Sequence, residues 1–182
     1  IVVNTTIEVC AAKEVRQALK HATNKQTSSE GSFYGLEQPA DTLFAKTVPY
    51  CDIDLEPYAY DVELAQSMLD EAGWVVGSDK IREKDGQKLN IDLLYNSDSV
   101  TEKAIAEYLQ SEYQKIGIAL NIHGEEEQSY RDNMKAGNFD MVFNICWGTP
   151  YDPQSSLAAM RAPVSGDYAA QLGLEDKADI DQ

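Results

Sequence analysis

The chain is short of basic residues for the number of acidic residues it carries. It has 15 Lys and Arg against 31 Asp and Glu, which gives a formal net charge of -16 and a pI near 4.3. Binding to a phosphate backbone requires clustered Lys and Arg, and a strongly acidic surface repels both nucleic acid and anionic membranes. The composition therefore argues against nucleic acid and membrane surfaces as partners.

Long hydrophobic runs are also missing. The apolar runs are short, such as residues 118–120, and fall far short of the roughly 20 apolar residues that a membrane-spanning helix needs. With 182 residues, of which 43% are hydrophobic and 25% charged, the chain fits one compact domain that can fold without disulfides. It opens at Ile1 without Met or a leader and stops in an uncapped helical pattern after residue 174, so we expect an excised segment.

Cysteine and histidine are scarce and widely spaced. Cys10, Cys51 and Cys146 form no Cys-x-x-Cys pair, which predicts buried free thiols rather than a zinc site or a disulfide framework. The two histidines, His21 and His123, have no potential metal-ligating partner nearby in sequence. We expect them to have surface or capping roles, and we predict no metal site in the chain itself.

The motifs of common enzyme classes are absent as well. There is no Gly-x-Ser-x-Gly elbow, no phosphate-binding loop and no dinucleotide fingerprint. The acidic run at residues 125–127 could hold a hard cation, as in a metal-dependent hydrolase, but we favour a role in complementing the dipole of the helix that it begins. Asp52, Asp54 and Glu56 lack the glycine and the bidentate glutamate of a calcium loop. We therefore predict that the chain is not an enzyme.

Helical periodicity is present in two parts of the first half. Residues 13–23 carry a single apolar stripe, and residues 61–72 carry another, with Asp61 as the predicted N-cap and Gly73 as the closing glycine. Residues 28–60 lose this periodicity and contain three prolines, which predicts an irregular crossing.

The second half is regular. Asp85 and Gly86 predict a hairpin turn, and Ser99 with Glu102 predicts a capping box. Three alternating segments separated by two helical patterns give strand, helix, strand, helix, strand, at about residues 89–93, 99–116, 118–122, 126–136 and 139–145. Helical crossovers of this length join parallel strands, so we predict an α/β fold whose core, at about residues 88–147, is a parallel or mixed sheet flanked by helices.

The segment after the third predicted strand is the predicted ligand site. Ligands of open parallel sheets gather beyond the carboxyl ends of the strands, and the third strand is expected to end at Cys146. In residues 147–153, two prolines and a glycine restrict the backbone while Trp147 and Tyr151 present flat rings on either side of Thr149. These rings either form a binding platform or pack the loop onto the sheet, and the two alternatives predict different exposure.

Several segments together resemble the large solute-binding proteins of the peptide and nickel import family, family 5 of the ABC transporter substrate-binding proteins. Within that family, the nickel-binding branch is the most similar. The resemblance spans nearly the whole chain and is carried by VRQALKHA at residues 15–22, ADTLFA at 40–45, AGW at 72–74, IREK at 81–84, GEEE at 124–127 and WGTPYDP at 147–153.

The resemblance implies a type II periplasmic-binding-protein fold and a role in uptake. Family members have two lobes that close on a ligand and then dock on the permease subunits of an ABC importer, outside the cytoplasmic membrane, in the periplasm or lipid-anchored at the cell surface. Residues 1–182 would form the C-terminal lobe, with residues 148–182 as the ligand-side loop and a truncated return. The partners implied are the N-terminal lobe, the permease and a small ligand; no cofactor is implied.

The resemblance also implies a ligand and its contacts. A nickel chelate is the expected ligand, and an oligopeptide or dipeptide is the alternative. Trp147 and Tyr151 match an aromatic pair that lines the family's pocket, with Thr149 in the same loop. Ser165 stands where the best-known nickel receptor has a metal-coordinating histidine, and a hydroxyl is a poorer nickel ligand than imidazole. The chelator could ligate the metal fully, a neighbouring residue could substitute, or the ligand could be other than nickel.

Overall fold

The structure is a computed structural model that describes residues 1–33, 39–42, 44 and 46–144. Its helices are α1 (Glu8–Ala11), α2 (Lys13–His21), α3 (Lys25–Phe33), α4 (Val62–Glu71), α5 (Val100–Gln114) and α6 (Glu127–Ala136). Its strands are β1 (Val2–Val3), β2 (Val75–Val76), β3 (Arg82–Lys84), β4 (Gln87–Lys88), β5 (Asn90–Asn96), β6 (Ala119–Glu125) and β7 (Met141–Val142).

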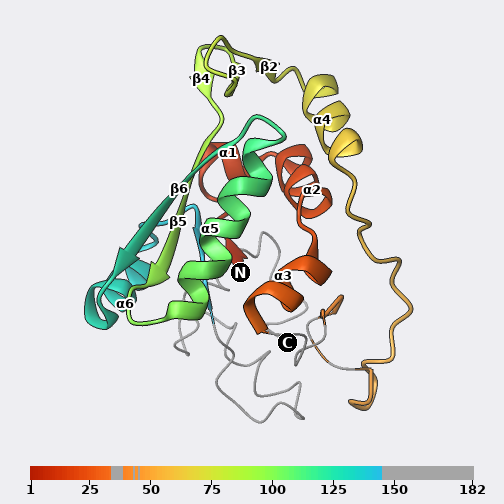
Figure 1. Ribbon diagram of the computed structural model, residues 1–182, viewed down its shortest axis with the longest axis vertical. Coiled ribbons are helices and arrows are strands. Elements are labelled where there is room, and N and C mark those ends of the chain that lie inside the picture. The colour runs from red at the N-terminus through yellow and green to blue at the C-terminus, as the bar shows by residue number, and fades with distance from the viewer. Residues whose placement is uncertain (34–38, 43, 45, 145–182) are drawn as a thin grey trace.

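The main sheet has the strand order β1-β7-β5-β6 (Figure 1). Strand β5 lies in the middle and runs parallel to both β6 and β7, whereas β1 pairs antiparallel with β7. The predicted α/β class and the parallel or mixed sheet are therefore confirmed. Strand β1 was not predicted, and it makes the sheet mixed.

Helices cover both faces of this sheet. Along β5, Ile91, Leu93 and Tyr95 join a core cluster that includes residues of α1, α2, α4 and α5, while Leu94 joins a smaller cluster with Tyr130 of α6. This alternation follows from the pleat of a strand, which sends successive side chains to opposite faces. Figure 1 shows α5 across one face and α6 behind the sheet.

The predicted helix ends are largely confirmed. The Asp61 side chain accepts a hydrogen bond from the backbone of Leu64 at 2.9 Å, and Gly73 has a φ of 87° after α4. The Ser99 hydroxyl likewise accepts from the backbone of Glu102 at 3.2 Å. The reciprocal half of the predicted capping box is wrong, because the Glu102 carboxylate accepts from the backbone of Asn96 at 2.9 Å instead.

Helix α3 corrects the prediction that residues 28–60 are irregular throughout. It has almost no apolar residues, so its sequence shows no helical stripe. The Asn24 side chain accepts a hydrogen bond from the backbone of Thr27 at 3.0 Å, as an N-cap residue does. Capping and tertiary contact with α5 therefore support a helix that periodicity could not reveal.

The predicted hairpin turn is confirmed, and the third predicted strand is shorter than expected. Asp85 and Gly86 have φ values of 52° and 82° between β3 and β4, as a two-residue turn requires. Strand β7 covers only Met141–Val142 of the predicted residues 139–145. The buried side chain of Asn4 donates to the carbonyl of Phe139 at 3.1 Å, so this carbonyl bonds a side chain rather than a neighbouring strand. Ile145 lies outside the described residues.

Residues 50–60, named the strap below, connect the first helices to α4 without forming a helix or a strand. The strap descends along one side of the molecule in Figure 1. Within the part of the chain described, no helix is both long and apolar enough to cross a membrane.

Candidate functional site

The carboxyl edge of the main sheet is the candidate functional site. Strands β5 and β6 end opposite each other, with Asn96 paired to Glu125, and β7 runs in the same direction. The chain leaves β7 at this edge through Phe143 and Asn144. The geometry up to this point agrees with a ligand site beyond the strands.

The carboxylates of the acidic run at residues 125–127 form hydrogen bonds with neighbouring side chains. Glu127 accepts hydrogen bonds from the side chains of Asn96 and Arg131, both at 2.5 Å, and Glu125 accepts one from Ser129 at 2.7 Å. These carboxylates lie at or before the first turn of α6, where negative charge is favourable. No group of three or more His, Cys, Asp or Glu among the described residues is arranged to hold a metal ion. The contacts favour the helix-start interpretation of the run.

Glu102 fixes the end of β5. Its side chain is buried, and its carboxylate accepts from the backbone of Asn96. Burial raises the pKa of Glu102, the Asn96 hydrogen bond opposes that shift, and the charge of Glu127 adds to it. The last residue of β5 is thus held through both its backbone and its side chain.

Tyr130 fixes the exit from β7 in a similar way. Its hydroxyl, carried on α6, donates to the backbone carbonyl of Phe143, whose own N–H donates to Leu94 at 3.3 Å. Burial raises the pKa of Tyr130, so the phenol stays protonated and can donate. Sequence reasoning missed this residue; its only signal was a single aromatic residue in a mostly polar helix.

The two histidines lie apart from each other and serve local contacts. The Nδ1 of His21 donates to the carbonyl of Ala59 at 2.9 Å, which joins α2 to the strap. The Nε2 of His123 lies 3.2 Å from a carboxylate oxygen of Asp92 on an exposed part of the sheet. These contacts agree with the predicted surface or capping roles.

The cysteine prediction holds in part. Cys10 and Cys51 are both free; Cys10 is fully buried, and burial raises its pKa to about 12. Cys51 is only partly buried because it lies on the strap, which contradicts the expected burial. Cys146 lies outside the described residues. Asp54 of the rejected calcium-loop pattern is exposed and lies 3.8 Å from Lys46.

The four predicted ligand contacts are Trp147, Thr149, Tyr151 and Ser165. All lie outside the described residues, as does the whole of residues 148–182. They remain predictions, and the structure describes the framework that leads to them.

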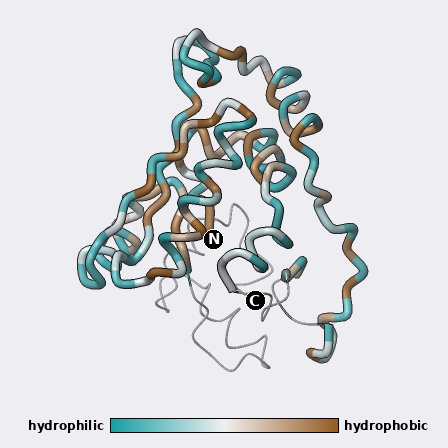
Figure 2. The backbone as a smooth tube through the Cα atoms, in the orientation of Figure 1, coloured by the Kyte–Doolittle hydropathy of each residue, from teal (hydrophilic) through white to brown (hydrophobic). Residues whose placement is uncertain are grey.

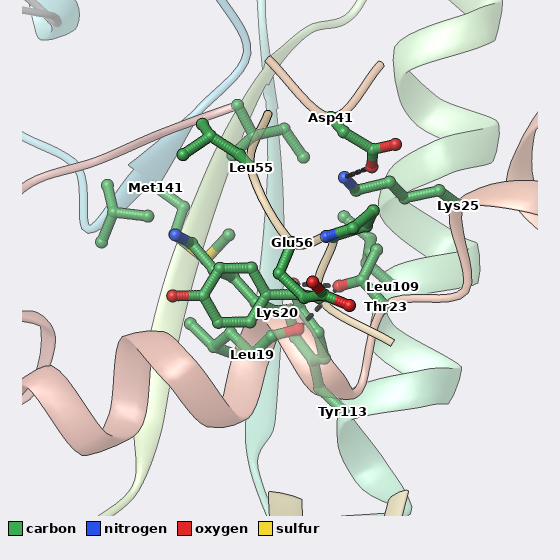
Figure 3. A pocket seen from close by; sticks show the side chains of 14 residues that line it. Leu19, Lys20, Thr23, Lys25, Asp41, Leu55, Glu56, Leu109, Tyr113 and Met141 are labelled. Carbon is green, nitrogen blue, oxygen red and sulfur yellow. Dashed lines mark hydrogen bonds and ion pairs between the residues drawn. The ribbon is translucent and has the colours of Figure 1, made fainter. Parts of the chain in front are cut away.

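A hollow of about 710 Å³ lies between the strap and helices α2 and α5. Figure 3 shows Leu55 and Asp41 on one side of it and Leu19 and Tyr113 on the other. The Lys25 ammonium lies 2.8 Å from Asp41, and the Thr23 and Tyr113 hydroxyls are 3.1 Å apart. Sequence reasoning did not predict this hollow, because its walls come from segments far apart in the chain.

Comparison with known proteins gives matches over most of the chain. The model of the bacterial extracellular solute-binding proteins, family 5 (middle part), matches residues 1–167. The nickel-binding periplasmic protein of Escherichia coli is 43% identical over 169 residues, which is 92% of this chain and 32% of that protein. The oligopeptide-binding protein AppA of Bacillus subtilis is 30% identical over 145 residues, 75% of this chain and 26% of that protein.

Among solved structures, NikA from Brucella suis in complex with Fe(III)-EDTA is similar in both sequence and fold. It is 46% identical with a TM-score of 0.89, and the match covers 99% of this chain and 36% of that chain. The chain thus spans about a third of the length of these relatives.

Proposed function

Because this chain belongs to the bacterial extracellular solute-binding proteins, family 5, we propose that it is the C-terminal lobe of an ABC importer's substrate-binding component. The proposed ligand is a nickel chelate captured outside the cytoplasmic membrane. The lobe would act with an N-terminal lobe of the same polypeptide and with permease subunits. We propose a binding role without catalysis, located in the periplasm or at the cell surface through a lipid anchor.

The observation that carries the nickel proposal is the similarity to the nickel-binding periplasmic protein of Escherichia coli over 92% of the chain. The Escherichia coli nickel-binding protein and Brucella suis NikA are 43% and 46% identical to it. Since the chain spans only about a third of each relative, the complete activity is a proposal.

The proposed mechanism begins at the carboxyl edge of the sheet. Glu102 and Tyr130 hold the ends of β5 and β7 at this edge, and residues 147–153 follow along the chain. There, Trp147 and Tyr151 would stack against the planar part of a chelate, and Thr149 would add a hydroxyl contact. Opposite charge for the chelator's carboxylates would come from the other lobe.

The identity of residue 165 bears on how the metal would be held. If this residue faces the metal, a hydroxyl contributes little to nickel binding compared with imidazole. We therefore propose that the chelator supplies most of the metal's ligands and that the protein recognises the chelate as a whole. The metal would be cargo and not a resident cofactor.

A peptide ligand is the second candidate. The oligopeptide-binding protein AppA of Bacillus subtilis is 30% identical over three quarters of the chain. The same aromatic loop could hold peptide side chains, because stacking and a few polar contacts suit either ligand. A long groove with a carboxylate for the peptide's amino terminus would support this alternative.

The test is calorimetric titration of the complete receptor with nickel plus free histidine and, separately, with short peptides. We expect the nickel mixture to bind and the Trp147→Ala variant to bind it at least about tenfold more weakly, through the loss of a stacking contact. Tyr50→Ala, at a fully exposed strap residue, is the matched control and should leave the affinity unchanged. Binding of peptides alone would replace the nickel proposal with the peptide alternative.

A further inference from the structure

Glu102 is a buried carboxyl group at the carboxyl edge of the main sheet. It lies in the first turn of α5, where its backbone N–H donates to the Ser99 hydroxyl, and its side chain is only 8% exposed. A glutamate in water is ionised at neutral pH, but ionisation in a buried place is costly unless the charge is well compensated. The charge of Glu102 therefore depends closely on its immediate neighbours.

A second carboxylate, Glu127 of α6, shares a hydrogen-bond donor with Glu102. Asn96 donates its backbone N–H to Glu102 at 2.9 Å and its side-chain amide to Glu127 at 2.5 Å. Glu127 also lies 2.5 Å from the guanidinium of Arg131, whereas the Asn96 N–H that Glu102 accepts belongs to a neutral peptide group. Two negative charges thus converge on the last residue of β5. Figure 2 shows the turn from β6 into α6, which carries the acidic run, mostly in the teal of hydrophilic residues.

The groups around Glu102 act on its pKa from three elements. Burial is the largest effect and raises the pKa; the Asn96 hydrogen bond lowers it, the charge of Glu127 raises it, and the amino group of Ile1 lowers it. The charge of Glu102 in turn helps to raise the pKa of Tyr130, so this neighbouring phenol stays protonated. The folded chain therefore holds a proton on Glu102 more tightly than the unfolded chain does.

We propose that Glu102 is a proton-sensing residue of the carboxyl edge, which accepts the Asn96 N–H as a carboxylate at neutral pH and as a neutral carboxyl group in acid. The proton comes from solvent, and no covalent bond of the backbone changes. Because a hydrogen bond to an ionised acceptor is about twice as strong as one to a neutral acceptor, the end of β5 has two states of different strength. Protonation also removes the repulsion between Glu102 and Glu127.

The position of this residue gives the proton a consequence for uptake. The carboxyl edge is where the proposed ligand would bind, and an anionic chelate would meet one negative charge fewer when Glu102 is protonated. This consequence rests on the proposed function, whereas the titration of Glu102 itself does not.

A nuclear magnetic resonance titration of the 182-residue chain tests the proposal without any ligand, so its outcome is independent of the proposed function. The Asn96 amide proton is the reporter, because it lies in the hydrogen bond to Glu102. We expect its resonance to shift as the pH falls, with a midpoint above the ordinary range for glutamate. Glu102→Gln keeps a carbonyl acceptor but has no charge to lose, so the shift should disappear.

Glu112→Gln is the matched control. It changes a second buried glutamate of α5, which is paired with Lys115 at 2.6 Å, and it should leave the Asn96 shift unchanged. An Asn96 shift that persists in Glu102→Gln would assign the titration to Glu127 and overturn the proposal. A midpoint within or below the ordinary glutamate range would overturn it as well.

Urea denaturation at a series of pH values gives a second readout with a defined sign. Since the folded chain binds the proton more tightly, the contribution of Glu102 to stability is lost as the pH rises through its folded pKa. We expect the wild-type chain to gain stability relative to Glu102→Gln as the pH falls over the range in which the Asn96 resonance shifts. A constant difference between the two chains, or one of the opposite sign, would contradict the proposal.

Discussion

At the residue scale, Gly117 is required where α5 turns into β6. Its φ is 81°, and a Cβ there would lie 2.8 Å from Cγ of Arg82 and 3.3 Å from its Nε. Its carbonyl also accepts the backbone N–H of Arg82 at 2.8 Å. Both the backbone conformation and the close approach of Arg82 therefore select glycine at this position.

Replacement of Gly117 by Ala should cost more stability than the same change at another left-handed glycine. Gly86 has a nearly identical φ of 82°, but nothing lies within 4 Å of a Cβ built there. We expect Gly86→Ala to lower the free energy of unfolding by about 1–2 kcal/mol through its backbone conformation alone. Gly117→Ala should lower it by at least about 1 kcal/mol more, because Arg82 must move.

Urea denaturation of the two variants measures this difference. If both variants lost the same free energy of unfolding, Arg82 would be able to move away from the added methyl group without an energetic cost.

At the scale of elements, Arg82 joins three parts of the chain. Its side chain is buried at 3% exposure; Nε donates to the carbonyl of Ile116 at 2.8 Å and Nη1 to that of Trp74 at 2.6 Å. The same Nη1 lies 2.5 Å from the carboxylate of Asp70 at the end of α4. One guanidinium thus connects α4, the hairpin of β3 and β4, and the turn before β6.

The substitution Arg82→Met should be strongly destabilising. Two carbonyls would lose their donor in a buried setting, and each such loss costs roughly 1–3 kcal/mol, so we expect a total near 3 kcal/mol. Arg131→Met removes an exposed ion pair with Glu127 and should cost about 1 kcal/mol or less. Guanidinium denaturation of both variants compares them, and a loss for Arg82→Met as small as that of Arg131→Met would show that water replaces the guanidinium.

The elements that the sequence predicted are those with a local signal. Helices α4 and α5 have an N-cap residue and an apolar stripe, and Asp85 with Gly86 marks the hairpin. Helix α3 was missed because it is almost entirely polar. Strand β1 was missed because Val2 pairs with Val142, far along the chain, and a strand of two residues has no sequence pattern that predicts its pairing partner.

In the candidate site, too, some features were predicted from the sequence and others were not. The position of the carboxyl edge follows from the strand order and was predicted. The bonds from Glu102 to Asn96 and from Tyr130 to Phe143 were not, because they join residues whose proximity depends on tertiary packing. Trp147, Thr149, Tyr151 and Ser165 stay predictions that rest on the family resemblance, and the family itself is confirmed by the matches.

At the scale of the whole molecule, ligand affinity is divided between parts of a receptor. A lobe that presents half of a pocket gains half of the contact free energy at best, yet it still has to immobilise the ligand. If the complete receptor bound a chelate at about 1 μM, half of that free energy would correspond to about 1 mM. Closure of a second lobe over the ligand is what converts the weaker value into the stronger one.

We therefore expect the 182-residue chain alone to show no measurable calorimetric binding of nickel plus free histidine at micromolar concentrations. In the part of the chain that the structure describes, no group of three potential metal-ligating side chains exists. The complete receptor, titrated under the same conditions, is the positive control. Submicromolar binding by this chain alone would mean that the whole recognition site lies within these residues, in which case the charge pairing assigned to the other lobe would have to come from this chain's own Lys and Arg.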